Sequence, residues 1–211
     1  KTKKKYFLKK NKHIDLYNSN KISTNKKIYL YPRFNIKSPR LNSEINIGFN
    51  GLKLKIYKKN ISYLSCKVVN EGILESNKGV HFTSKIKLPP LTEKDIQALK
   101  ISKKMKINIF AISFVNKAND VSIVRKIVGI KSIIISKIET KNALKHLTEI
   151  SKNSNALLID RGDLSRYIPI EKIPIIQEEI SNFTKLTKKP LYVATNLLET
   201  MVKDNQPTRA E

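Results

Sequence analysis

Apolar β-branched runs alternate with amphipathic helical stretches beyond Pro89-Pro90, and this alternation constrains the fold more than any other feature. The helical stretches place apolar residues on one face, as Val121, Val124 and Val128 do. Strands that are apolar throughout and separated by helices are typical of a parallel sheet buried on both faces. A doubly wound sheet and a (β/α)8 barrel both fit this pattern, and periodicity does not choose between them. The runs are Ile107–Val115, Ile133–Ile138, Ala156–Ile159 and Leu191–Ala194.

The first part of the chain has shorter apolar runs separated by turn residues, which predicts a small β domain. In Leu52–Ile56 apolar and basic residues alternate strictly, as in a strand with one face in water. We therefore expect an all-β domain over residues 1–82 and an α/β domain over residues 83–211. The expected strands of the first domain are Ile28–Tyr31, Ile45–Ile47, Leu52–Tyr57 and Ile61–Val69.

Composition excludes several classes of protein. An apolar fraction of 40% is too high for an intrinsically disordered chain. The single cysteine, Cys66, excludes a disulfide framework and a multi-cysteine metal site. Uncharged apolar runs such as Ser132–Ser136 are far shorter than the ~20 residues that cross a bilayer, so no membrane association is expected.

The net charge of +25 comes from 36 lysines and only six arginines against 17 acidic residues. Lysine, isoleucine and asparagine are enriched together, as a compositional bias produces, whereas a nucleic-acid surface more often recruits arginine. A solvated lysine-rich surface is therefore the preferred interpretation, and nucleic acid is not expected as a partner. The excess is greatest near the start of the chain, so a phosphate-binding role for Lys1–Lys27 stays open as a further hypothesis.

Polar residues follow the predicted strands at the ends where α/β enzymes place their chemistry. Lys137 and Glu139 are two residues apart at the end of one strand, so both side chains leave the same face. Asp160–Asp163 ends the next strand, and Thr195 follows the last. Together they could bind a divalent cation and neutralise a phosphoryl group, although Lys137 and Glu139 could equally form a structural ion pair. The sequence has no Gly-x-Gly-x-x-Gly and no Gly-Lys-Ser/Thr phosphate-binding motif.

Several of these segments occur in the order and spacing found in pyruvate kinases, which the chain resembles best over residues 60–211. The resemblance implies strands four to seven of a (β/α)8 TIM-type barrel, preceded by most of a small all-β lid called the B domain. It also implies that the chain is an excerpt of a longer protein. The segments that carry it are Cys66–Val69, Lys78–Val80, Leu88-Pro89, Glu93–Ile96, Ser113–Val115, Ile134–Glu139, Arg161–Leu164, Ala194-Thr195, Leu198-Glu199 and Pro207–Glu211.

In this family the phosphoryl group of phosphoenolpyruvate passes to ADP, giving pyruvate and ATP in the last step of glycolysis. The cofactors are Mg²⁺ (or Mn²⁺) and K⁺. Lys137 resembles the catalytic lysine that stabilises the moving phosphoryl group, and Glu139 and Asp163 resemble the metal-binding carboxylates. Gly162 and Asp163, with the catalytic Thr195 hydroxyl, resemble the residues that bind the substrate. Lys78 resembles a lid lysine that approaches the nucleotide.

Other positions depart from the family pattern. Phe49-Asn50 precedes Gly51 where two aspartates are usual, Asn116 stands where arginine is common, and Asn196 replaces glutamine. The alternative hypothesis is therefore a catalytically silent module, related to pyruvate kinase, that serves in binding or regulation. The resemblance further implies a homo-oligomer, a tetramer in the family, and a cytoplasmic location. An organelle stays open as a location because the sequence begins at Lys1 rather than at a methionine.

Overall fold

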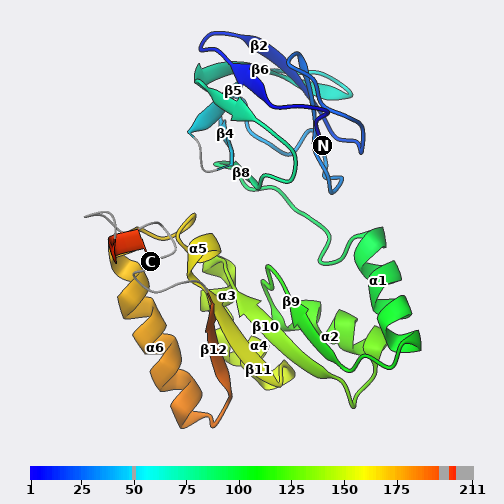
Figure 1. The fold of residues 1–211 in the computed structure, drawn as a ribbon, viewed down its shortest axis with the longest axis vertical. Coiled ribbons are helices and arrows are strands. Elements are labelled where there is room, and N and C mark those ends of the chain that lie inside the picture. The colour runs from blue at the N-terminus through cyan, green and yellow to red at the C-terminus, as the bar shows by residue number, and fades with distance from the viewer. Residues whose placement is uncertain (49–50, 195–199, 203–211) are drawn as a thin grey trace. The chain divides into compact units, whose positions relative to one another are not determined.

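The computed structural model describes residues 1–48, 51–194 and 200–202 (Figure 1). Its contacts divide the chain into two compact units, Lys1–Thr92 and Glu93–Glu211. Each unit is described by itself below. No helix in the described part of the chain has the length and apolarity needed to cross a membrane.

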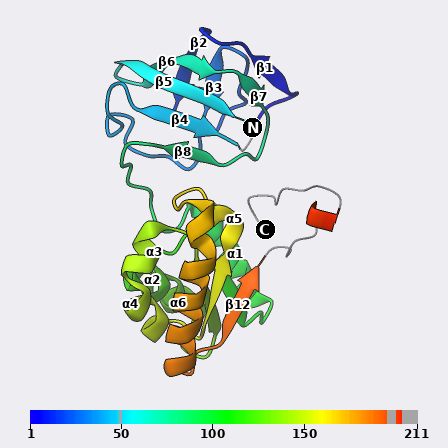
Figure 2. The same cartoon turned by 90° about the vertical axis from the view of Figure 1, so that its left-hand side faces the viewer.

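The described residues of the first unit form eight strands and no helix (Figure 2). Six strands make one sheet in the order β3-β2-β6-β5-β4-β8, in which all neighbours are antiparallel except β2 and β3. The other two, β1 and β7, pair antiparallel in a small separate sheet. The strands are β1 (Tyr6–Leu8), β2 (His13–Tyr17), β3 (Lys27–Tyr29), β4 (Glu44–Ile47), β5 (Leu52–Lys59), β6 (Tyr63–Asn70), β7 (Gly72–Leu74) and β8 (Val80–Phe82).

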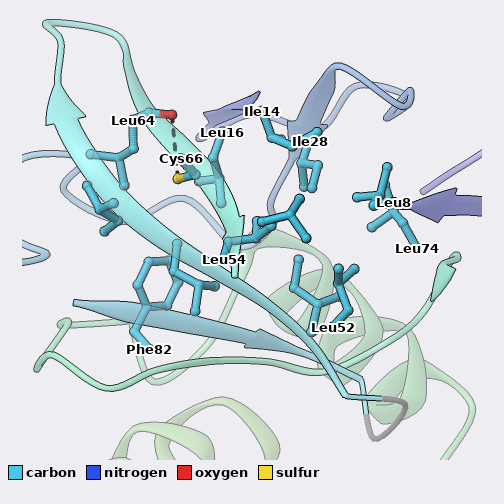
Figure 3. Close-up of a cluster of buried hydrophobic side chains, with 14 of the residues drawn as sticks. Leu8, Ile14, Leu16, Ile28, Leu52, Leu54, Leu64, Cys66, Leu74 and Phe82 are labelled. Carbon is cyan, nitrogen blue, oxygen red and sulfur yellow. Dashed lines mark hydrogen bonds between the residues drawn. The ribbon is translucent and has the colours of Figure 1, made fainter. Parts of the chain in front are cut away.

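Strict alternation of side chains builds the core of this unit. In β5 the apolar residues Leu52, Leu54 and Ile56 are buried while Lys53 and Lys55 are exposed, as the sequence pattern predicts. Figure 3 shows how side chains from β1, β2, β3, β5, β6, β7 and β8 gather in one apolar cluster. Each buried leucine or isoleucine contributes about 1.5–3 kcal/mol of transfer free energy, which makes this cluster the main source of the unit's stability.

The Cys66 thiol lies inside this cluster and is fully buried. Burial, helped by the charge of Asp15, raises the pKa of Cys66 from 9.0 to about 12. At neutral pH the thiolate, which is the reactive form, is therefore about a thousandfold scarcer than in the unfolded chain.

We expect iodoacetamide to label Cys66 at least about a thousandfold more slowly in the native protein than in denaturant. Mass spectrometry of timed samples measures both rates, and glutathione under the same two conditions corrects for the effect of the denaturant on the reagent. Equal native and denatured rates would show that the thiol is not held in the core.

The second unit is built on four parallel strands in the order β12-β11-β10-β9. Strands that are neighbours in the chain are neighbours in this sheet, without the reversal that defines a doubly wound fold, so the arrangement is that of a (β/α)8 barrel segment. The strands are β9 (Ile109–Ile112), β10 (Ile133–Ile138), β11 (Ala156–Asp160) and β12 (Leu191–Ala194). All four overlap the strands predicted from the sequence, but β9 is shorter than the predicted run Ile107–Val115, in which Phe114 has a left-handed backbone.

Helices precede and connect these strands. They are α1 (Glu93–Lys104), α2 (Ala118–Val128), α3 (Lys141–Lys145), α4 (Leu147–Asn153), α5 (Arg161–Leu164) and α6 (Ile173–Leu186), with short 3-10 turns η1 (Ile170–Lys172) and η2 (Thr200–Val202). The face of α2 predicted to be apolar is buried at Val121, Val124 and Val128. The stretch from Ala143 to Ile150, which the periodicity predicts as one helical face, is instead two helices that meet at His146. The His146 amide donates to the carbonyls of both Asn142 and Leu144, which ends α3 in a tight turn.

Candidate active site

The candidate site lies at the carboxyl ends of β10 and β11. Lys137 is in β10, Glu139 follows that strand directly, and Asp160 is the last residue of β11. The parallel register pairs Ile138 with Ile159, so Glu139 and Asp160 leave the sheet side by side. Pairing of adjacent strands thus brings together residues that are 21 positions apart.

Lys137 joins the two carboxylates. Its Nζ lies 2.7 Å from Glu139 Oε1 and 3.0 Å from Asp160 Oδ2. Contact with two acidic groups is more than a surface lysine ordinarily makes, and it fixes the ammonium at the end of the sheet. Lys137 and Glu139 lie close together, as the sequence predicts.

The helical turn α5 adds a third carboxylate. Asp160 caps this turn, its side chain accepting a hydrogen bond from the Asp163 amide at 3.3 Å. Asp163 Oδ1 in turn lies 3.1 Å from Arg166 Nε. Arg161 Nε donates to the Ala194 carbonyl at 3.4 Å, which links α5 to the end of β12. Gly162 lies between Arg161 and Asp163 within this turn.

Glu139 is held from the opposite side by the loop after β9. Its side chain is fully buried, and Oε2 accepts a hydrogen bond from the Phe114 amide at 2.5 Å. Phe114 has a positive φ of 54°, a left-handed conformation that costs a non-glycine residue about 1–3 kcal/mol. Asn116 fixes the same loop, because its side chain accepts from the Thr140 hydroxyl at 2.9 Å. Asn116 therefore has a structural role at the position where arginine is common in the resembled family.

The three charged groups titrate differently because their surroundings differ. Burial outweighs the ion pair with Lys137 and holds the pKa of Glu139 above its ordinary value. Burial also acts on Asp160, but its contacts with Lys137 and the Asp163 amide prevail and lower its pKa. The pKa of Lys137 is raised, since its two carboxylate partners outweigh the opposing effect of burial.

The site has the chemistry of a divalent-cation site. One carboxylate oxygen from each of Glu139, Asp160 and Asp163 lies within 4.8 Å of the others. Glu139 Oε1 is buried, and its contact is the Lys137 ammonium at 2.7 Å. Clustered carboxylate oxygens of this kind fit a hard cation such as Mg²⁺.

The positions of two predicted site residues, Thr195 and Lys78, relative to this cluster are not determined. Thr195 lies outside the described residues, as do Phe49, Asn50 and Asn196. Lys78 belongs to the first unit, where its Nζ lies 2.9 Å from Glu75 Oε1. The resemblance gives no individual role to Asp160, whose proximity to Lys137 depends on strand register.

The family model described as "Pyruvate kinase, barrel domain" matches residues 1–211, the whole chain. The chain belongs to the pyruvate kinase family. It is 35% identical over 179 residues to a pyruvate kinase of Agrobacterium vitis, covering 84% of this chain and 37% of that protein. The pyruvate kinase of Dictyostelium discoideum is 36% identical over 168 residues, covering 78% of this chain and 33% of the relative.

The pyruvate kinase of Thermotoga maritima is 40% identical over 144 residues, covering 66% of this chain and 31% of the relative. The chain thus spans about a third of the length of the curated relatives that it matches. The fold class predicted from the sequence is confirmed, with a parallel β/α segment of the pyruvate kinase barrel domain and an antiparallel β unit. The assignment of residues 1–82 and 83–211 as lid and barrel stays a prediction.

Pyruvate kinases use a metal ion, and the buried Glu139 carboxylate should affect the stability of the protein when no metal is bound. At neutral pH we expect Glu139→Gln to raise the melting temperature of the full-length protein when divalent cations are absent. The reason is that a raised folded-state pKa makes ionised Glu139 cost stability at pH values above that pKa. As the pH falls through the folded-state pKa, Glu139 takes up its proton and the difference between the two proteins should close.

Calorimetry from pH 4 to 8 with and without Mg²⁺ tests this expectation. Mg²⁺ should raise the melting temperature of the wild type much more than that of the variant. Glu149→Gln, a change at an exposed position of α4, is the matched control and should leave both responses unchanged. A lower melting temperature for Glu139→Gln without cation at pH 7 would mean that its contact with Lys137 outweighs its burial.

Proposed function

We propose that the full-length protein transfers the phosphoryl group of phosphoenolpyruvate to ADP, giving pyruvate and ATP. The observation that carries this proposal is the contact of one fixed ammonium, that of Lys137, with carboxylates from two adjacent strand ends. A phosphoryl group in transfer spreads negative charge over its oxygens, and a fixed cation close to it lowers the barrier. Membership of the pyruvate kinase family supports the same reaction.

In this proposal Lys137 faces the phosphoryl oxygens, while Glu139 and Asp163 hold the divalent cation. When bound, Mg²⁺ (or Mn²⁺) would supply further positive charge for the phosphoryl and substrate oxygens. Glu139 suits this role because the Phe114 amide fixes one of its oxygens, while the other lies in the group of carboxylate oxygens formed with Asp160 and Asp163. Asp163 suits it because α5 sets its place beside Asp160.

The remaining assignments rest on the family relationship. Gly162 and Asp163 bind the carboxylate of the substrate with the Thr195 hydroxyl, and Lys78 approaches the nucleotide. K⁺ is the second cofactor. Phosphoenolpyruvate loses its P–O bond as a new one forms to a terminal oxygen of ADP. The enolate left behind takes a proton at carbon to become pyruvate, and Thr195 assists that step.

The test is pyruvate formation by the purified full-length protein from phosphoenolpyruvate and ADP, with Mg²⁺ and K⁺ present. We expect a rate that requires all four components and that disappears when the divalent cation is chelated. Absence of pyruvate and ATP under these conditions would leave the silent binding or regulatory module as the function. Nucleic-acid binding through Lys1–Lys27 would show as an affinity that falls steeply with salt, and it is not expected.

We also propose that the protein is a homo-oligomer, a tetramer as in the resembled family, and that it acts in the cytoplasm. An organelle is the alternative location, since a relative that is 35% identical over 164 residues is the plastidial pyruvate kinase 2 of Arabidopsis thaliana. Light scattering of the purified protein and imaging of a tagged full-length protein would test these two points.

A further inference from the structure

The proposed reaction gives no role to Asp160, although its side chain contacts two of the proposed active-site residues. Asp160 Oδ2 lies 3.0 Å from Lys137 Nζ, and Oδ1 accepts the hydrogen bond of the Asp163 amide. We infer that Asp160 is a positioning residue, which holds the Lys137 ammonium at the place where the phosphoryl group is transferred. This inference rests on the proposed function.

Lys137 needs such a partner because its other one, Glu139, is shared. Lys137 Nζ lies 2.7 Å from Glu139 Oε1, and the Glu139 carboxylate also belongs to the group of three that could hold a divalent cation. A divalent cation on that carboxylate competes with the ammonium for the same negative charge. Asp160 gives Lys137 a second contact, through a separate carboxylate on the neighbouring strand.

Asp160 is suited to this task because its own carboxylate is fixed. It is the last residue of β11 and the capping residue of α5, so the sheet and the turn both determine its position. The side chains of Lys137 and Asp160 are only 21% and 16% exposed, so water screens their attraction less than it would a surface pair. A long, flexible lysine is thereby held by a short, immobile aspartate.

A double-mutant cycle on the full-length protein tests this role, using Lys137→Met, Asp160→Ser and the two changes combined. Serine keeps a side-chain oxygen that can cap the Asp163 amide while it removes the carboxylate that contacts Lys137. We expect Asp160→Ser to lower kcat at least about tenfold, with the KM for phosphoenolpyruvate changed less than about threefold. When Lys137 is already methionine, adding Asp160→Ser should lower kcat less than about twofold further, because the effect of Asp160 acts through the lysine.

Thermal unfolding of the same four proteins measures the contact without reference to activity. If Lys137 and Asp160 pair as the geometry indicates, the double variant should lose less melting temperature than the sum of the two single losses. A wild type that makes no pyruvate would refute the proposed function, and the unfolding cycle would then decide alone whether Asp160 holds Lys137. The exposed α6 change Glu179→Gln controls for the loss of one negative charge.

Three results would overturn the inference. Additive losses of melting temperature would mean that the two side chains do not act as a pair. If the losses of melting temperature are not additive but the losses of kcat are fully additive, the pair stabilises the fold and does not position the lysine for catalysis. Electron paramagnetic resonance measures the Kd for Mn²⁺ in the variants. If that Kd rises as much in Asp160→Ser as in Asp163→Asn, Asp160 is a metal ligand instead.

Discussion

Replacing Lys137 by methionine is expected to slow ATP formation by the full-length protein by about 10²–10³-fold, the cost of removing one preorganised charge donor. Methionine keeps the length and packing of the side chain and deletes the charge that the phosphoryl group meets. The affinity for phosphoenolpyruvate should change much less than the rate. Single-turnover measurement of ATP formation reports the chemical step directly.

Thr195→Ala provides the internal comparison. In the proposed reaction the neutral Thr195 hydroxyl serves the substrate carboxylate and protonation of the enolate. This variant should therefore lose less of the phosphoryl-transfer rate than Lys137→Met and more of the protonation rate. Incorporation of solvent protons into pyruvate measures the second step. Lys126→Met, at an exposed position of α2, should leave both rates unchanged. A near wild-type rate of ATP formation in Lys137→Met would make Lys137 a structural residue.

Residues 1–211 expressed alone are expected to be inactive and poorly soluble. The four-stranded sheet ends at β9 and β12, whose outer backbone groups pair with no further strand among the described residues. Apolar side chains are exposed on both edge strands, with Ile109 55% and Tyr192 52% accessible. Open parallel edges of this kind pair with other chains and lead to aggregation.

Lysine substitution on the edges distinguishes this cause from general apolar exposure. Ile109→Lys combined with Val193→Lys should increase the soluble fraction, because charged edge strands resist pairing with one another. Ile101→Lys, at a similarly exposed position of helix α1, should help much less. A wild-type product of 211 residues that is monomeric and melts cooperatively would contradict the expectation.

The elements that the sequence predicts correctly are those whose pattern reflects their own burial. Strand β5 alternates because one face is wet, and β10 and β11 were predicted from their nearly continuous aliphatic runs. The expected burial of both faces is not met in β10, where Ile134, Ser136 and Ile138 are buried but Ile133 is 40% exposed. The short strands β1 and β7 carry no such signal, since three residues show neither alternation nor a continuous run. The turn α5 was not predicted because its four residues are too few to show a helical pattern. A cap and a contact from elsewhere in the unit stabilise it instead.

The candidate site was only partly predictable for a related reason. The spacing of Lys137 and Glu139 places them on one side of the same strand, which the sequence shows directly. The contact of Lys137 with Asp160 depends on the register between two strands, and that register comes from packing along the whole sheet. The amide of Phe114 reaches Glu139 through a left-handed backbone that its residue type does not suggest.

That left-handed position has a consequence for laboratory evolution of this protein. A library at position 114 that is sorted for thermostability alone should enrich glycine and asparagine, which adopt a positive φ at little cost. The same library sorted for turnover should retain phenylalanine if its ring, 45% exposed in the loop that holds Glu139, contributes to the reaction. Divergence between the two sorted pools would identify position 114 as a site where folding and catalysis impose opposite demands.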